Sequence, residues 1–175
     1  MPISFEPTGT FSGPAGGSNV LSNPTSLQFG PDGRLYASEQ NGSINAFTVE
    51  LQDGTWVATD HEQLVDGSGE EIVKNLQNHN DDGTESGSGN RQVTGIVVAG
   101  TADAPVLYIS SSDPRIATNN DSGLDTNSGV VTRANWNETT QAWDVVDLVR
   151  GLPRSEENHS VNGMILSPDG TKLLL

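Results

Sequence analysis

The residue best suited to chemistry is His159, which lies within residues 151–170, GLPRSEENHSVNGMILSPDG. A neutral imidazole has an ordinary pKa of about 6.5, so it can accept a proton near neutral pH. The histidine comes shortly before an apolar run that ends in Ser-Pro-Asp-Gly. This order places it on a polar loop that leads into a strand. The alternative interpretation is a loop histidine hydrogen-bonded to the backbone.

Acidic and amide side chains form a candidate calcium site in the stretch DSGLDTNSG, where Asp121, Asp125 and Asn127 offer hard oxygen ligands. Asx turns explain the same residues without an ion. Residues 78–89 also imitate the start of a calcium-binding loop, but the twelfth position is Gly89, where such a loop needs a bidentate glutamate. We therefore interpret residues 78–89 as a solvated loop.

Two arginines in polar loops, Arg115 and Arg154, have the planar fork that can clamp an anionic or sugar ligand. The alternative is an ion pair with a nearby acid, which needs no ligand. Asp113, Glu156 and Glu157 are the acids within reach along the chain.

Three stretches repeat one pattern of strand, turn and strand. They are NPTSLQFGPDGRLYAS at residues 23–38, QVTGIVVAGTADAPVLYISSS at 92–112, and residues 161–175. Setting Thr25, Thr94 and Asn162 as equivalent gives offsets of 69 and 68 residues. A regular period indicates stacked units rather than one irregular core.

Apolar alternation and turn residues predict the strands inside each repeat. The predicted strands are residues 27–29, 35–38, 44–49 and 55–58, then 93–98, 106–111, 129–134 and 143–149, and finally 161–166 and 172–175. Residues 3–11 predict one more strand, and residues 62–77 predict either a short helix or a long connection. The chain is therefore all-β.

This pattern predicts a β-propeller of four-stranded antiparallel blades, cut to about two and a half blades. We expect residues 1–22 to be an N-terminal strand and linker, 23–90 the first blade and its connecting loop, 91–160 the second blade, and 161–175 the start of a third. The loops at 78–91 and 150–160 occupy the same place in successive repeats, so we expect them to be neighbours. An antiparallel sandwich is the alternative architecture.

Composition narrows the classes of partner. The 175 residues include 23 Asp and Glu against 8 Lys and Arg, giving a formal net charge of −15. Such a surface repels nucleic acid and anionic membranes, because both need cationic contacts. There is no cysteine for a disulfide or thiolate site, no apolar run of membrane-spanning length, and no visible secretion signal. The sequence also has no P-loop or dinucleotide fingerprint.

The blocks NPTSLQFGPDGRLYASEQNGSI and LVRGLPRSEENHSVNGMILSPDG resemble the soluble quinoprotein glucose/sorbosone dehydrogenases. That family consists of six-bladed propellers that use pyrroloquinoline quinone and calcium. The resemblance implies an extracellular or periplasmic enzyme that oxidises a sugar or related alcohol. It also implies that most quinone and calcium ligands lie beyond Leu175.

The resemblance assigns His159 as the general base that takes the proton of a sugar hydroxyl. It implies a sugar-contacting amide at Asn90 or Gln92, and Arg154 belongs to the same substrate loop. Asn158 stands where the family usually places an acidic residue that orients the base. A noncatalytic propeller that binds carbohydrate or protein through its loop face is the rival interpretation.

Overall fold

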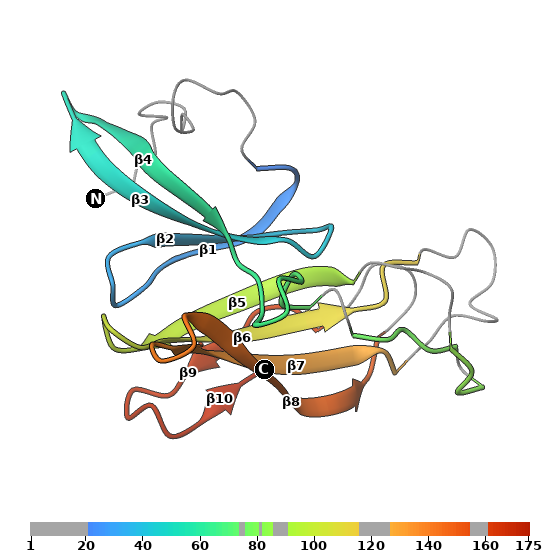
Figure 1. The fold of residues 1–175 in the computed structure, drawn as a ribbon. Helices are drawn as coiled ribbons and strands as arrows, with labels where there is room; N and C mark the ends of the chain where they lie inside the picture. The colour runs from blue at the N-terminus through green and yellow to red at the C-terminus, as the bar shows by residue number, and fades with distance from the viewer. Residues whose placement is uncertain (1–20, 74–75, 81, 86–90, 116–126, 155–160) are drawn as a thin grey trace, which may run out of the picture.

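The computed structural model describes residues 21–73, 76–80, 82–85, 91–115, 127–154 and 161–175. These residues form two four-stranded antiparallel sheets and one two-stranded hairpin (Figure 1), and they contain no helix. The all-β prediction is therefore confirmed. The strand predicted over residues 3–11 lies outside the described residues.

The first sheet consists of β1 (Pro24–Phe29), β2 (Leu35–Glu39), β3 (Ile44–Gln52) and β4 (Thr55–Gln63), paired in that order. Its turns explain its topology. Asp53 and Gly54 join β3 to β4 with φ values of 50° and 81°, the left-handed pair that a tight hairpin needs. Asp32 closes the β1–β2 turn by accepting a hydrogen bond from the Arg34 backbone nitrogen at 3.2 Å.

The second sheet repeats this order with β5 (Gln92–Gly100), β6 (Pro105–Ser112), β7 (Gly129–Asn137) and β8 (Ala142–Leu152). The strands β9 (Ile165–Leu166) and β10 (Leu173–Leu174) form the hairpin of the third repeat. All ten predicted strands of the three repeats are present, although most extend by a few residues beyond their predicted ends. Between β4 and β5 the described residues 64–73 and 76–77 form turns and a bridge from Val65 to Glu71, so this part of residues 62–77 is a connection rather than a helix.

A backbone irregularity confirms that the first two repeats are equivalent. The β1–β2 register shifts between Pro24 and Ser26, and the β5–β6 register shifts between Val93 and Gly95. The skipped residues are Thr25 and Thr94, the pair aligned from the sequence. The Thr25 hydroxyl lies 2.9 Å from that of Ser38, and the Thr94 hydroxyl lies 3.2 Å from that of Ser110. The same bulge and hydroxyl pair therefore recur in both sheets.

The two sheets pack through one apolar cluster, and β1 and β2 contact β5 across it (Figure 1). Tyr36, Ile44 and Leu64 meet Val93, Leu107 and Ile109 in this cluster, and all six are almost fully buried. The burial removes apolar surface of both sheets from water, which is the main favourable contribution to folding.

Polar contacts fix the register between the sheets. The Gln28 side chain accepts a hydrogen bond from the Val98 backbone nitrogen at 2.9 Å, and it donates to the Val98 carbonyl at 3.4 Å. The described sheets do not themselves form a closed ring. None of the described residues forms a helix long and apolar enough to cross a membrane.

Substituting Gly95 by alanine is expected to destabilise the chain. The added Cβ would lie 2.8 Å from the Asn162 carbonyl oxygen and 3.0 Å from Ser110 Oγ. Overpacking of this kind costs about 1–3 kcal/mol, so the urea midpoint of the Gly95→Ala protein should fall. Gly67→Ala is the matched control, because its nearest contact would be an ordinary 3.7 Å. Equal midpoints for the two variants would contradict the close packing of the third repeat on β5.

Candidate functional site

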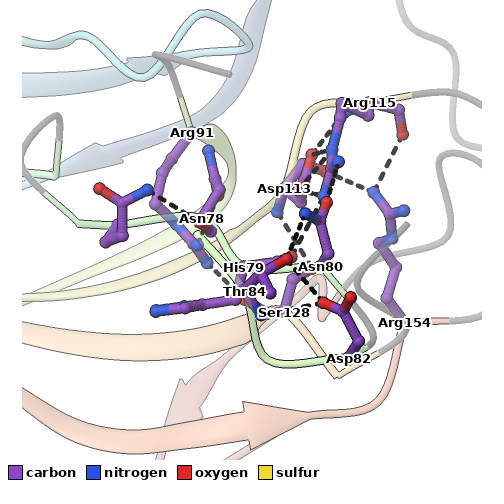
Figure 2. Close-up of polar contacts among 11 residues, drawn as sticks. Asn78, His79, Asn80, Asp82, Thr84, Arg91, Asp113, Arg115, Ser128 and Arg154 are labelled. Atoms are coloured by element: carbon purple, nitrogen blue, oxygen red, sulfur yellow. Dashed lines mark hydrogen bonds and ion pairs between the residues drawn. The ribbon is translucent and has the colours of Figure 1, made fainter. Parts of the chain in front are cut away.

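A buried polar network lies at one end of the second sheet, where β5 and β7 begin and β6 and β8 end (Figure 2). Its centres are three arginines, Arg91, Arg115 and Arg154. Each is held by carbonyl, amide or carboxylate oxygens from segments far apart in the sequence. The network therefore connects the loops at this end of the sheet.

Arg91 is 2% exposed and directly precedes β5. Its Nε donates to Ser111 Oγ at 3.1 Å and its Nη1 donates to Asn78 Oδ1 at 2.8 Å. Its Nη2 donates to the carbonyls of Ser111, at 3.0 Å, and Ser128. A guanidinium has five donors in a fixed fork, so one side chain can join these three segments. Arg91 thus attaches the segment at Asn78 to the ends of β6 and β7.

Arg115 forms an ion pair with Asp113, whose side chain is fully buried. The Arg115 Nε lies 2.8 Å from Asp113 Oδ2 and Nη2 lies 2.5 Å from the same oxygen. The Nη1 donates to Asn80 Oδ1 at 2.7 Å, and the Nη2 also donates to the His79 carbonyl at 3.1 Å. The ion-pair interpretation therefore holds for Arg115. Its guanidinium orders the protein's own loop.

Arg154 lies just after β8 and is 5% exposed. Its Nη1 donates to the carbonyls of Asp113 at 2.6 Å and Arg115 at 3.0 Å, as the dashed lines in Figure 2 show. The described parts of the loops at 78–91 and 150–160 therefore both contact residues 113–115. Arg154 acts here on backbone oxygens, and the structure shows no carboxylate partner for it among the described residues.

The calcium-like stretch is held as a turn by its own side chains. Asp82 accepts hydrogen bonds from the Thr84 backbone nitrogen at 2.9 Å and from Thr84 Oγ1 at 2.6 Å. Asn80 donates to Thr84 Oγ1 at 2.9 Å. The side-chain hydrogen bond from Thr84, followed by the backbone one, lowers the pKa of Asp82 below its ordinary value. These contacts hold Asn80, Asp82 and Thr84 together in a turn.

The structure describes three of the predicted site residues. Gln92 is buried at the start of β5, opposite Ser112, and Arg154 joins the network described above. Asn127 is exposed in the turn before β7. The other predicted site residues lie outside the described residues: His159, Asn90, Asn158, Asp121 and Asp125. The structure therefore leaves those assignments as predictions.

Sequence reasoning singled out the loop 78–91, but it did not predict the roles of Arg91 and Asn78 within it, and it missed Ser128. Arg91 and Ser128 each directly precede a buried strand, β5 and β7. The sequence feature that could have indicated Arg91 and Ser128 is a polar residue next to a buried strand. Its side chain needs hydrogen-bond partners once the strand is packed. That signal marks the positions but does not identify the partners.

The described residues do not provide a calcium site. They contain no group of three or more His, Cys, Asp or Glu side chains that could hold a metal ion. The buried carboxylate nearest the loops, Asp113, is already paired with Arg115. The structure therefore leaves the calcium and quinone that the sequence resemblance implies as a prediction.

No family model matches the chain, and no curated protein matches it. Two solved structures of a Trichoderma reesei carbohydrate-active enzyme of family AA12, an iodide structure and a calcium structure, have a similar fold. Each superposes with a TM-score of 0.50 and 16% sequence identity over 87% of this chain. The chain spans 29% of one and 28% of the other, less than a third of their length. At this identity the likeness shows the fold alone.

The resemblance to the soluble quinoprotein glucose/sorbosone dehydrogenases is therefore wrong as an assignment of family, because the structural neighbours are AA12 enzymes and no family model matches. The turns within the quoted blocks show why it misled. Asp32 accepts from the Arg34 nitrogen, and Asp169 accepts from the Thr171 nitrogen at 3.1 Å. Pro-Asp-Gly favours the backbone conformation of a tight turn, so it occurs in antiparallel hairpins of unrelated families.

Replacing Arg91 by lysine is expected to lower the free energy of unfolding by about 2–4 kcal/mol, because an ammonium cannot supply the fork that satisfies three segments. Urea denaturation of the chain measures this change. Arg150→Lys is the matched control, since the Arg150 side chain is 53% exposed and pairs with Asp147. We expect a change of no more than about 0.5 kcal/mol there. A similarly small change for Arg91→Lys would show that the network does not hold this end of the sheet.

The carboxyl of Asp82 is expected to titrate below its ordinary pKa of 3.8 in an NMR titration, and Thr84→Val should move the pKa upward because it removes the strongest hydrogen bond. Because the pKa of Asp82 is lower in the folded than in the unfolded protein, its ionised carboxylate stabilises the fold. This contribution to the free energy of unfolding is fully present at pH values above the pKa of Asp82 in the unfolded chain. It is lost as the pH falls through the folded value. Thr59→Val, on β4, is the control and should leave the Asp82 titration unchanged. An Asp82 pKa that is the same in the Thr84→Val and wild-type proteins would contradict the hydrogen bond from Thr84 to Asp82.

Proposed function

We propose that this chain forms part of a β-propeller oxidoreductase that acts on a carbohydrate. The observation that carries the proposal is the likeness in fold to a carbohydrate-active enzyme over 87% of the chain. The recurring four-stranded sheets support the propeller, because blades of this kind are its repeating unit. In this proposal residues 23–90 and 91–160 are successive blades, residues 161–175 begin the next, and residues 1–22 precede them.

The proposed reaction site lies on the loops that the arginine network holds. Arg115 and Arg154 tie residues 79–80, 113–115 and the end of β8 to one another. The loop from Arg154 onward carries His159, five residues later in the sequence. We assign His159 the role of general base, which accepts the proton of a sugar hydroxyl as the carbon that bears it is oxidised. Neutral imidazole performs this step near neutral pH.

Substrate binding in this proposal uses amide groups next to the network. Asn90 and Gln92 flank Arg91, and Asn158 precedes the base. Arg154 positions the loop through the carbonyls that it contacts. Amide groups both donate and accept hydrogen bonds, which suits a polyhydroxylated ligand.

Pyrroloquinoline quinone and calcium are the cofactors that we propose for the longer protein, with most of their ligands beyond Leu175. The calcium structure of the AA12 enzyme supports the choice of metal. Asp121, Asp125 and Asn127 are the proposed calcium ligands within this chain. We place the activity outside the cytoplasm, in the extracellular space or a periplasm.

A second candidate function is a noncatalytic propeller that binds carbohydrate or protein through the same loops. The likeness in fold supports it equally, because one fold can host both enzymes and binding modules. Cofactor dependence distinguishes the two functions, because a binding module reduces no electron acceptor.

The deciding experiment measures reduction of an artificial electron acceptor by the full-length protein with pyrroloquinoline quinone and calcium, across a panel of sugars. We expect cofactor-dependent activity, with kcat reduced about 100-fold or more in His159→Ala. His61→Ala is the control, because His61 lies on the exposed part of β4 and bonds Asn45 at 2.8 Å. A folded, cofactor-exposed protein without activity would contradict the enzyme and leave the binding module.

A further inference from the structure

The face of the first sheet that points away from the second sheet is apolar and largely uncovered (Figure 1). On the inner face, Tyr36 and Ile44 pack in the cluster shared with the second sheet. On the opposite face, Ala37, Phe47 and Ala58 form a small cluster of their own. Beyond that cluster, four large apolar side chains are between 52% and 59% exposed, namely Leu27, Phe29, Leu51 and Trp56.

These four side chains belong to one surface, which we call the outer apolar surface. Leu27 pairs with Ala37 across the β1–β2 ladder, and Leu51 pairs with Trp56 across the β3–β4 ladder. Residues directly opposite each other in an antiparallel pair point to the same face. The rings of Phe29 and Trp56 lie 6.3 Å apart, so the surface is continuous from β1 to β4. A continuous exposed apolar surface marks an interaction site.

The chain that precedes β1 reaches the sheet over this same face. Leu21 packs against the cluster that contains Ala37. The backbone nitrogen of Ser22 donates a hydrogen bond to Glu39 Oε1 at 2.9 Å. Glu39 follows Ala37 by two residues on β2, so its buried side chain lies on the same face. Residues 1–20 therefore join the described chain at the outer face of the first sheet.

The sequence of the N-terminal segment matches an apolar surface. Residues 3–6 are Ile-Ser-Phe-Glu, and this alternation gives a strand one apolar side, formed by Ile3 and Phe5. Residues 12–20, SGPAGGSNV, form a Gly- and Ser-rich connection to the sheet. A flexible connection of this length spans about 15–18 Å. Four strands at their usual spacing measure about 14 Å across, so the segment can reach any part of the surface.

We propose that the outer apolar surface binds the chain's own N-terminal segment, residues 3–11. Phe5 packs on the rings of Phe29 and Trp56 in this arrangement, and Ile3 points to the same side and extends the contact. Burial of both apolar surfaces drives the association. The connection keeps the segment at an effective concentration of about millimolar, which favours it over a second copy of the chain. This inference goes beyond the proposed function and does not depend on it.

The first test measures the accessibility of Trp56 in the full-length protein by NMR. The indole N–H signal of Trp56 is assigned by its loss in Trp56→Phe, and a neutral nitroxide in the solvent broadens the signals of exposed groups. Phe5→Ser should increase the broadening of the Trp56 signal about threefold or more, because it removes a buried apolar ring. Phe5→Leu should keep the protection. The signal of Trp136, which lies on β7 in the second sheet, should be the same in all variants.

A second test uses disulfide cross-linking, since the chain has no cysteine of its own. The full-length double variant Ile3→Cys/Leu51→Cys should form an intramolecular disulfide with oxidised glutathione. The matched control is Ile3→Cys/Gln52→Cys, because Gln52 follows Leu51 on β3 and points to the opposite face. We expect the control to form the disulfide about tenfold more slowly, because its two thiols meet less often.

Four results would overturn the inference. Equal protection of Trp56 in the wild-type and Phe5→Ser proteins would mean that another part of the longer protein covers the surface. Strong broadening in both would mean that nothing covers it. Protection that disappears when the wild-type protein is diluted would make the occupant a second copy. Equal rates of disulfide formation in the two double variants, which both keep Phe5, would place the segment elsewhere even if Phe5→Ser fails to fold.

Discussion

The rest of the structure depends on the packing of the first sheet against β5. The apolar cluster between the sheets holds β1 and β2 on β5, and the paired hydrogen bonds between Gln28 and the Val98 backbone set their register. Because register in a sheet is fixed to the residue, this contact places every loop at both ends of the second sheet. One end of that sheet carries the arginine network.

The arginine network supports the loops at its end of the second sheet. The guanidinium groups there donate hydrogen bonds to oxygen atoms of the protein. Arg91 donates to Asn78, Ser111 and Ser128, and Arg154 donates to two backbone carbonyls. Such fully engaged groups make a rigid platform from which loops can present other residues.

Much of the fold could be predicted from sequence because its signals are local. Asp53-Gly54 and the Pro-Asp-Gly turns specify hairpins, and the threonines aligned as Thr25 and Thr94 occupy equivalent bulges. The site could not be predicted in the same way. Arg91 finds its partners 13 to 37 residues away in sequence, and no local pattern encodes those distances. The same locality explains the mistaken family, since turn motifs describe hairpins rather than ancestry.

A crystal structure of the full-length protein with a bound saccharide is the measurement that tests the central claim most directly. The account predicts further four-stranded sheets that continue the order of β1 to β8 around an axis. It also predicts that the sugar ring to be oxidised lies on the loops at the Arg115 and Arg154 end, within reach of His159. Two sheets closed upon each other as a sandwich, or a saccharide bound away from those loops, would contradict it.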